Sequence, residues 1–319
     1  MSKIVVTGGL GFIGSEFINI LNENKSIKIL NLDTETYAAD RNRLKLKNKH
    51  NYRFIKLNVN NFDILKNTVN KFKPNLIINF AAETHVDNSI KNSDNFFNTN
   101  IKGTYNILEI LKSNTSIGLI HISTDEVYGD VLKGFSDEDK SLLNPSSPYS
   151  ASKAAAEHLI KSYARTFKVR SIILRPCNAF GPKQHAEKMI PNSCINLSKN
   201  RPIPIYGNGK NIREWIYVQD LANIIKKITL DFKLHIGETF NISTNFFLNN
   251  IQMAKLICNT MQKKPVKDFI LFVEDRKGHD FRYANNNDKV FKKLKLDKKW
   301  INSTEQKLLN TIKLILNDN

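Results

Sequence analysis

Short apolar runs alternate with amphipathic stretches along the first half of the chain. The apolar runs are Lys3–Thr7, Ile27–Asp33, Tyr52–Val59, Asn75–Ala82 and Ile117–Ser123. Between them, apolar residues recur at helical spacing in Phe12–Asn24, Phe62–Phe72 and Phe96–Lys112. Near-continuous apolar strands that alternate with helices are typical of a parallel sheet covered on both faces. The pattern therefore predicts an α/β fold with a doubly wound parallel sheet and right-handed crossovers.

The second half of the chain begins regularly and then changes in texture. A helix is predicted to open at Ser147–Pro148, where the missing N–H of proline costs little, and a strand follows at Arg170–Pro176. After this strand, proline and glycine residues separate shorter predicted elements. We expect residues 1–176 to form the larger domain. Residues 177–213 and 244–319 should form a smaller, mixed C-terminal domain, and residues 214–243, with "REWIYVQD" and "ETFNIS", should return to the main sheet.

Composition and charge narrow the classes of protein. Of 319 residues, 41% are hydrophobic and 24% are charged, as in ordinary globular proteins, and the net charge is +18. No recognition helix, zinc spacing or aromatic RNA-binding signature accompanies the scattered lysines, so we do not expect a nucleic-acid partner. The chain start does not look like a signal peptide, and no apolar run is long enough to span a bilayer. Cys177, Cys194 and Cys258 show no metal-ligand or disulfide spacing, so we expect a cytoplasmic protein without a metal site.

A glycine-rich stretch follows the first predicted strand. "TGGLGFIG" places Gly8, Gly11 and Gly14 between that strand and the first helix. Such glycines allow the backbone to approach a pyrophosphate at a helix N-terminus, where free N–H groups attract anions. Asp33 ends the second strand 19 residues after Gly14, in the position of an acid that accepts ribose hydroxyls. The first domain is therefore predicted to be a Rossmann-type domain that binds NAD in preference to NADP.

Tyr149 and Lys153 stand four residues apart on one face of a predicted helix. A free tyrosine has a pKa of about 10 and is a poor base at neutral pH. A lysine ammonium and a positively charged nicotinamide would both favour the phenolate. Behind a dinucleotide loop, this pair indicates a redox site in which the lysine also holds the nicotinamide ribose.

Thr124, Asp125 and Glu126 follow directly after the apolar run Ile117–Ser123. They lie at the carboxyl end of a predicted parallel strand, where ligands bind in such sheets. A hydroxyl beside the tyrosine would suffice for simple oxidation or 4-epimerisation. Two added carboxyls favour elimination, because neighbouring acids can have their pKa values pushed apart, and one can then donate a proton while the other removes one.

Several segments resemble one known family. "TGGLGFIG", "HISTDEVYG" and "YSASK" resemble the extended short-chain dehydrogenases/reductases in order and spacing. "AAETHVDNSI", "NTNIKGTYNILE", "NPSSPYSASKAAAEHLI", "EKMIP", "PIPIYGNGKNIREWIYVQD" and "DRKGHDFRYA" are similar to nucleotide-sugar 4,6-dehydratases, and most of all to the dTDP-glucose 4,6-dehydratase family. The resemblance extends along nearly the whole chain.

The resemblance implies a reaction. Tyr149 would take the proton of the 4-hydroxyl, oriented by Thr124, while C4 gives its hydride to NAD. Glu126 would remove the C5 proton and Asp125 would protonate the departing 6-hydroxyl. Return of hydride to C6 would leave a 4-keto-6-deoxy sugar nucleotide and regenerate tightly bound NAD.

The resemblance also implies binding residues and a partner. The NAD site would be lined by Gly8, Gly11, Phe12, Ile13, Gly14, Asp33, Asn58, Val59, Ala81, Ala82, Thr99, Tyr149 and Lys153. The sugar-nucleotide site would be lined by Thr84, Thr124, Asn178, Lys188, Met189, Pro204, Ile205, Tyr206, Arg213, Asn241, Arg276 and His279. The stretches Phe97–Lys112 and Ser150–Ala164 resemble the helices of the family's dimeric four-helix bundle, which predicts a homodimer.

Some positions depart from the family pattern and keep alternatives open. Asn58 stands where an aspartate usually meets the adenine, and Ala179 replaces an asparagine near the cofactor. Lys183, Gln184 and Ala186 change the substrate loop in the direction of relatives that act on UDP- or GDP-linked sugars. A UDP-glucose or other nucleotide-hexose dehydratase, a 4-epimerase or decarboxylase of the same fold, and a non-enzymatic NAD-binding protein are the alternatives.

Overall fold

The main sheet has seven strands in the order β10-β6-β5-β4-β1-β2-β3, all of them parallel to their neighbours. The computed structural model describes residues 2–297, 299 and 303–317. The strands are β1 (Ser2–Thr7), β2 (Ile27–Asp33), β3 (Tyr52–Lys56), β4 (Leu76–Asn79), β5 (Gly118–Ile122), β6 (Ser171–Pro176) and β10 (Thr239–Ile242). The predicted doubly wound parallel sheet is confirmed.

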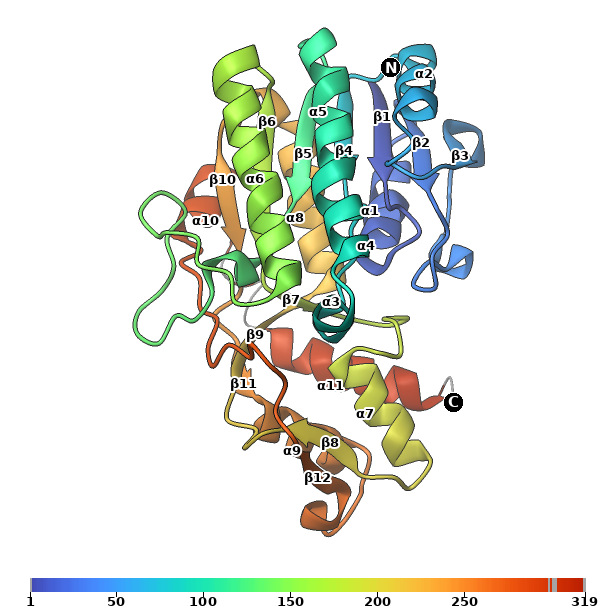
Figure 1. Cartoon of the computed structure of the whole chain (residues 1–319). Coiled ribbons are helices and arrows are strands. Elements are labelled where there is room, and N and C mark those ends of the chain that lie inside the picture. The colour runs from blue at the N-terminus through green and yellow to red at the C-terminus, as the bar shows by residue number, and fades with distance from the viewer. Residues whose placement is uncertain (1, 298, 300–302, 318–319) are drawn as a thin grey trace.

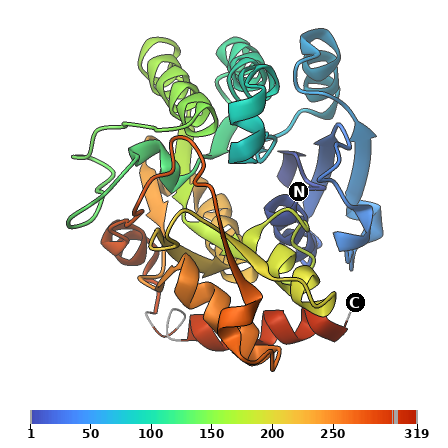
Figure 2. The same cartoon turned by 60° about the horizontal axis from the view of Figure 1, so that its bottom comes forward.

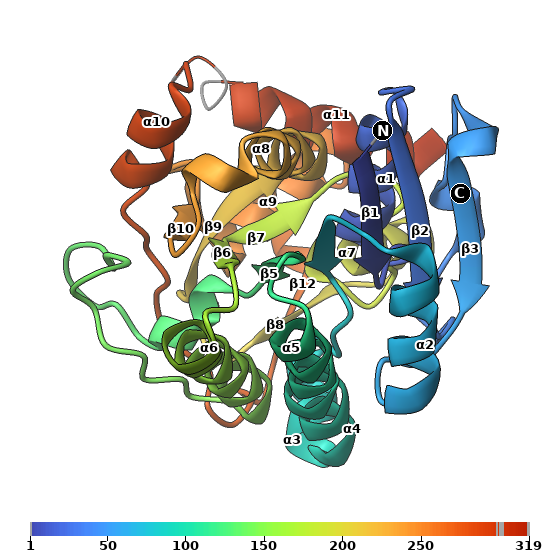
Figure 3. The ribbon, with the colours of Figure 1, turned by 90° about the horizontal axis from the view of Figure 1, so that it is seen from above.

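Helices cover both faces of this sheet (Figures 1 and 3). One layer contains α1 (Phe12–Asn22), α8 (Val218–Leu230) and α10 (Asp288–Leu294), and the other contains α2 (Phe62–Phe72), α5 (Gly103–Ser113) and α6 (Pro148–Phe167). Successive side chains of β1 serve the two cores in turn: Ile4 and Val6 pack with the first layer and Val5 with the second. This double burial explains why the strands are apolar almost throughout.

The strand order reverses between β1 and β4. From β1 the chain proceeds outward to β3, then crosses to β4 and proceeds the other way to β10. Such a reversal opens a crevice at the carboxyl ends of the central strands, where ligands bind in sheets of this type. The arrowheads of the main sheet point toward a smaller lobe beneath that edge (Figures 1 and 2).

Among the described residues, the smaller lobe combines two short sheets with three helices. One sheet has the order β11-β9-β7 and the other pairs β12 with β8. The elements are β7 (Asn178–Phe180), α7 (Met189–Ser198), β8 (Ile203–Tyr206), β9 (Ile212–Tyr217), β11 (Phe247–Asn249), α9 (Asn250–Thr260), β12 (Ile270–Val273) and α11 (Thr304–Asn317). They share one apolar core around Leu197, Met253, Ile257 and Leu308.

One prediction about the domain boundary is wrong. β10 and α8 do belong to the main layers, but "REWIYVQD" does not join the main sheet: β9 pairs with β7 and β11 instead. The edge of β6 is already occupied by β10, so β9 pairs with the short strand that follows β6. An apolar run predicts a strand, but the strand with which it pairs depends on which sheet edge is free.

Two helical regions differ from a simple pattern. The predicted helix Phe96–Lys112 is divided into α4 (Asp94–Phe96), a π-helical stretch (Phe97–Lys102) and α5. A short helix, α3 (Val86–Lys91), precedes it, and 3-10 turns occur between other elements, among them Arg41–Arg43, Lys49–Asn51, Asp125–Tyr128, Phe232–Leu234 and Val266–Phe269. Within the described residues, none of the helices has both the length and the apolar character required to cross a bilayer.

Candidate active site

The glycine loop forms a cradle between β1 and α1. Gly8 has a φ of +70°, and a Cβ there would lie 2.5 Å from the backbone nitrogen of Ala81. A Cβ on Gly14 would lie 2.5 Å from the carbonyl oxygen of Gly8. Gly11 caps α1 without any side-chain hydrogen bond, so the first N–H groups of the helix stay available. The cradle fits the pyrophosphate of a dinucleotide, which needs close backbone approach and free N–H donors.

Asp33 closes one end of the cavity beside this cradle. Its Oδ2 accepts the N–H of Leu10 at 2.9 Å and its Oδ1 accepts the N–H of Glu35 at 2.8 Å. Burial raises the pKa of the carboxyl, and those N–H groups oppose the rise. The cavity measures about 390 Å³ and is lined by Gly8, Gly11, Asp33, Asn58, Val59, Ala81, Ala82 and Thr99.

Thr124, Asp125, Glu126, Tyr149 and Lys153 all line a second cavity of about 260 Å³. This cavity shares Gly8 and Gly11 with the first, and Phe12, Ile13 and Gly14 also line it. The fold therefore brings the predicted residues after β5, those in α6 and those in the glycine loop to one cavity.

The trio after β5 is organised by a 3-10 turn. The hydroxyl of Thr124 accepts the N–H of Glu126 at 3.3 Å and donates to Asp125 Oδ1 at 3.2 Å. Burial raises the pKa of Asp125 well above its ordinary value, and the charges of Glu126 and Glu214 add to the effect. Burial also raises the pKa of Glu126, but Arg276, Arg213 and Lys188 oppose that rise. The environment therefore favours a protonated Asp125 beside a more readily ionised Glu126.

Tyr149 and Lys153 lie in the first turns of α6. A capping box between Ser147 and Ser150, with Pro148 in the first turn, begins this helix. The pKa of Tyr149 is raised by burial and by the charge of Glu126, while the Thr124 hydroxyl opposes the rise. Lys153 Nζ donates to the carbonyl oxygen of Ile122 at 2.6 Å, and burial lowers its pKa to about 8. The protein alone therefore orients the pair without making Tyr149 a strong base.

An outer cavity of about 500 Å³ lies beside the second cavity, which we call the inner cavity and which contains Asp125, Glu126 and Tyr149. It shares Thr84, Glu126, Asn178 and Lys188 with the inner cavity. The predicted substrate residues that line it are Thr84, Asn178, Lys188, Met189, Pro204, Ile205, Tyr206, Arg213, Arg276 and His279. They come from both lobes, so the cavity exists only where the lobes meet.

The prediction for Asn241 is wrong. Asn241 lies in β10 with no exposed surface, and its amide is used internally. Its Oδ1 accepts the hydroxyl of Tyr128 at 2.8 Å, and its Nδ2 donates to the carbonyl oxygen of Ser136 at 3.1 Å. Asn250, at the start of α9, lines the outer cavity instead. The run "NISTNFFLNN" contains several asparagines, and only the fold shows which of them reaches the cavity.

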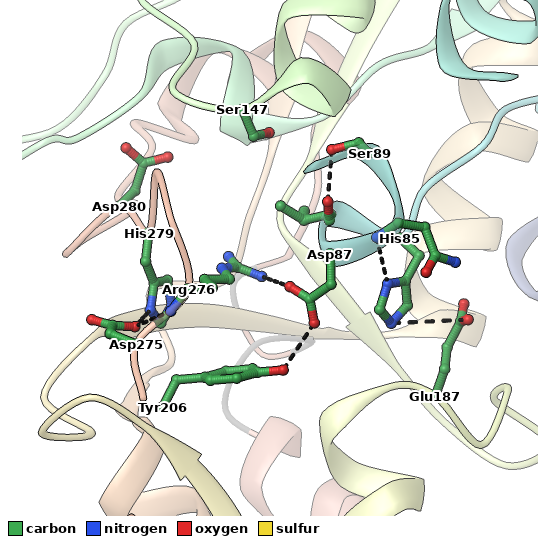
Figure 4. Close-up of polar contacts among 12 residues, drawn as sticks. His85, Asp87, Ser89, Ser147, Glu187, Tyr206, Asp275, Arg276, His279 and Asp280 are labelled. Carbon is green, nitrogen blue, oxygen red and sulfur yellow. Dashed lines mark hydrogen bonds and ion pairs between the residues drawn. The ribbon is translucent and has the colours of Figure 1, made fainter. Parts of the chain in front are cut away.

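Asp87 is a residue that the sequence reasoning missed. It lies in α3 and contacts two substrate-lobe side chains across the outer cavity (Figure 4). The Tyr206 hydroxyl donates to Asp87 Oδ2 at 2.9 Å, and Arg276 Nη1 lies 3.7 Å from Asp87 Oδ1. His279 Nδ1 and Asp275 Oδ1 are 2.6 Å apart in the same loop as Arg276. The stretch "AAETHVDNSI" contained the signal, but nothing in it showed that Asp87 faces Arg276.

Three cationic side chains line the outer cavity. Arg213, Arg276 and Lys188 each act on Glu126 with a positive charge. Arg213 is oriented by the carbonyl oxygens of Asp280 and Ile212, both at 2.8 Å, and its guanidinium lies 4.2 Å from the ring centroid of Tyr283. Converging guanidinium and ammonium groups suit a diphosphate.

The comparisons with known proteins agree along nearly the whole chain. Residues 5–305 match the family model described as GDP-mannose 4,6 dehydratase. The chain is 38% identical to a dTDP-glucose 4,6-dehydratase of Haemophilus influenzae, with 92% of each chain covered. It is 39% identical to the low-salt glycan biosynthesis protein Agl12 of Haloferax volcanii, with 88% of this chain and 89% of that one covered.

A solved structure shows the same fold. The dTDP-glucose 4,6-dehydratase of Bacillus anthracis, crystallised in complex with NAD, aligns with a TM-score of 0.88 and 35% identity, over 100% of this chain and 97% of that one. The matches to the family model and to the solved structure both include the glycine cradle and the residues Thr124–Glu126 that follow β5. The chain belongs to the dTDP-glucose 4,6-dehydratase family of NAD-dependent epimerases/dehydratases and is an enzyme of the nucleotide-sugar 4,6-dehydratase type.

Proposed function

We propose that this enzyme converts dTDP-glucose into dTDP-4-keto-6-deoxyglucose and water, with NAD as a tightly bound cofactor. The observation that carries the proposal is that Asp125 and Glu126 line the same cavity as Thr124 and Tyr149. Oxidation or epimerisation needs no such acid pair, whereas elimination of water needs both a proton donor and a proton acceptor.

The first cavity fits the proposed NAD. The glycine cradle leaves no room for side chains at Gly8 and Gly14, and the uncapped start of α1 offers its N–H groups to a pyrophosphate. Asp33 would accept ribose hydroxyls at the far end of the cavity. When bound, NAD supplies the oxidation at C4 and the later reduction at C6.

Tyr149 and Thr124 would act on the 4-hydroxyl. Tyr149 is 6% exposed and lines the cavity with Thr124, so both hydroxyls can face one substrate oxygen. Thr124 orients that oxygen and Tyr149 takes its proton. The positive charge of Lys153 then favours the phenolate, which the protein environment by itself disfavours.

Glu126 and Asp125 would carry out the elimination. The 4-ketone acidifies the C5 proton, which Glu126 removes. The electron pair released at C5 forms the C5–C6 double bond as the C6–O bond breaks, and Asp125 gives its proton to the departing hydroxyl, which leaves as water. The unequal environments of the two carboxyls match these roles, because Arg276, Arg213 and Lys188 favour ionisation of Glu126.

The outer cavity would hold the nucleotide. Arg276, Arg213 and Lys188 would bind the diphosphate, and the half-exposed ring of Tyr206 would contact the base. Family membership supports dTDP, because the Haemophilus influenzae and Bacillus anthracis relatives are both dTDP-glucose 4,6-dehydratases. The altered loop around Lys183, Gln184 and Ala186 makes UDP-glucose, or another nucleotide hexose, the second candidate.

We also propose a homodimer that pairs α5 and α6 with their copies in a second chain. Phe97 in the π-helical stretch and Tyr105 in α5 are 44% and 43% exposed, and Phe167 at the end of α6 is 36% exposed. Exposed aromatic side chains on neighbouring helices favour burial against a partner. Light scattering tests this, and a monomeric mass at micromolar concentration would contradict it.

A substrate panel tests the reaction. Purified protein is incubated with dTDP-, UDP-, GDP- and CDP-glucose and with UDP-N-acetylglucosamine, first without added NAD, and each mixture is analysed by mass spectrometry. Loss of one water from dTDP-glucose is the expected result. Loss from another nucleotide would change the substrate, and no loss from any of them, even with NAD added, would refute the dehydratase reaction.

A further inference from the structure

We propose that Glu214, a residue outside the cavities described above, is a positioning residue for the elimination: it keeps Asp125 in the form that donates a proton. The inference rests on the proposed function, in which Asp125 protonates the 6-hydroxyl. Glu214 follows Arg213 in β9, and neighbouring strand residues point to opposite faces, so Arg213 reaches the outer cavity while Glu214 points into the protein.

Glu214 is held in a fixed position without being neutralised. The side chain has no exposed surface, and its Oε1 accepts two backbone N–H groups, that of Thr244 at 2.8 Å and that of Asn245. Its Oε2 is buried, and the Ser243 hydroxyl and the Asn285 N–H add to the groups that favour the ionised carboxyl. An ionised carboxyl in this position retains much of its field, because buried charges are screened far less than exposed ones.

Asn285 fixes the relation between Glu214 and Asp125. The Asn285 side chain is 1% exposed, and its Nδ2 donates to Asp125 Oδ2 at 3.4 Å. The carbonyl oxygen of Asn285 accepts the hydroxyl of Ser243 at 3.3 Å, and Ser243 precedes Thr244, whose N–H is bound by Glu214. The thiol of Cys177 experiences both carboxyls. Burial raises the pKa of this thiol, and the charges of Glu214 and Asp125 both add to that rise. A chain of hydrogen bonds through Ser243, Thr244 and Asn285 thus connects the two carboxyls, and both charges act on the buried thiol.

The charges around this pair determine the sign of the effect. Asp125 faces Glu126 in its own turn, Arg213 from β9 and Tyr149 from α6, and only Arg213 favours its ionised form among these charged groups. Burial raises the pKa of Glu214 to about 7, against the N–H groups of Thr244, Asn245 and Asn285. Above that pH Glu214 is ionised, and its charge opposes the loss of the Asp125 proton.

The consequence is a limited pH range in which Asp125 is protonated and can donate its proton. Elimination requires an ionised Glu126 and a protonated Asp125, so its rate should be bell-shaped in pH. The alkaline limb reports the loss of the Asp125 proton. Removal of the charge at position 214 lets Asp125 ionise at lower pH, and the alkaline limb then moves down by about one unit, the usual size of such a shift.

Two matched pairs of holoenzymes test the proposal. Wild type and Glu214→Gln differ in charge at full side-chain length, and Glu214→Asp and Glu214→Asn differ in charge at a length shorter by one methylene. Single-turnover water loss from the panel's substrate is followed across pH by mass spectrometry, and C4 oxidation is followed in the same samples by the absorbance of reduced cofactor.

We expect the two carboxylate forms to share one alkaline limb and the two amide forms to share a lower one. At pH values above both alkaline limbs the amide forms should lose water about tenfold more slowly, as a shift of one unit implies, while C4 oxidation stays within about twofold. The shorter pair decides the question if Glu214→Gln does not fold. Equal limbs in charged and neutral members, or an equal loss of C4 oxidation, would overturn the proposal. Absence of water loss in wild type would instead refute the proposed function.

Discussion

The inner and outer cavities are built in different ways. In the inner cavity, Asp125 and Lys153 are each 2% exposed and are tied to neighbouring protein groups. In the outer cavity, Tyr206 is 39% exposed, and Arg276 contacts Asp87 at 3.7 Å across the gap between the lobes (Figure 4). The inner group depends on the parallel sheet and on α6, and the outer group depends on β8, β9 and the loop that carries Arg276 in the smaller lobe.

This difference in burial indicates that the inner cavity determines the type of reaction and that the outer cavity determines the choice of substrate. Buried groups have shifted pKa values and fixed directions, which proton transfers require. Half-exposed side chains on loops can exchange a protein partner for a ligand at little cost. Substitutions in the inner cavity should therefore change the rate of individual chemical steps, and substitutions in the outer cavity should change affinity.

The largest effect is expected from the acid pair. Asp125→Asn and Glu126→Gln should each slow water loss about 10²–10⁴-fold, because general acid or base catalysis is lost. C4 oxidation should survive, so a nucleotide sugar lighter by two hydrogens should accumulate, and mass spectrometry would detect it. If oxidation fell by the same factor, the two carboxyls would not be specific to elimination.

A somewhat smaller effect is expected from the tyrosine that starts the reaction. Tyr149→Phe removes the base for the 4-hydroxyl and should slow C4 oxidation about 10²–10³-fold, at the lower end of the range for such catalysis. The rate of cofactor reduction measures it. Tyr206→Phe is the matched control from the outer cavity, and it should change KM while leaving the reduction rate at saturating substrate nearly unchanged.

In the outer cavity, Arg276→Ala should act on affinity. Loss of one charged contact to the diphosphate should raise KM about 10- to 100-fold, with little change in kcat at a pH where Glu126 stays ionised without Arg276. Steady-state kinetics separate the two constants. Arg276→Lys keeps the charge without the planar fork and should recover only part of the affinity. A fall in kcat with an unchanged KM would place Arg276 in the chemical step instead.

The smallest effect is expected from Asp87. Asp87→Asn removes the negative charge that Arg276 faces and should strengthen binding of the nucleoside diphosphate about two- to fivefold, as expected for a half-exposed ion pair. Calorimetry at low and high salt measures it, and the gain should shrink as salt screens the charge. Asp63→Asn, on the exposed surface of α2, is the control and should change nothing. Weaker binding in Asp87→Asn would show that Asp87 instead holds Arg276 ready for the ligand.

Periodicity and local motifs carried much of the prediction. The alternation of apolar runs and helical stretches is dictated by burial on both faces of a parallel sheet, and β1 to β6 lie where it placed them. The glycine cradle, Asp33, the trio after β5 and the Tyr149–Lys153 pair depend on contacts close in sequence, so short stretches reveal them. All of these residues line the first cavity or the inner cavity.

Contacts between distant segments could not be derived in this way. The pairing of β9 with β7, the burial of Asn241, the reach of Asn250 and the position of Asp87 opposite Arg276 depend on how the smaller lobe meets the sheet edge. Glu214 is the clearest case, since its sequence neighbours are Arg213 and Trp215 while its electrostatic neighbour is Asp125. Periodicity records only which residues avoid water, whereas charges interact through space, and the folded chain alone decides which of them lie close together.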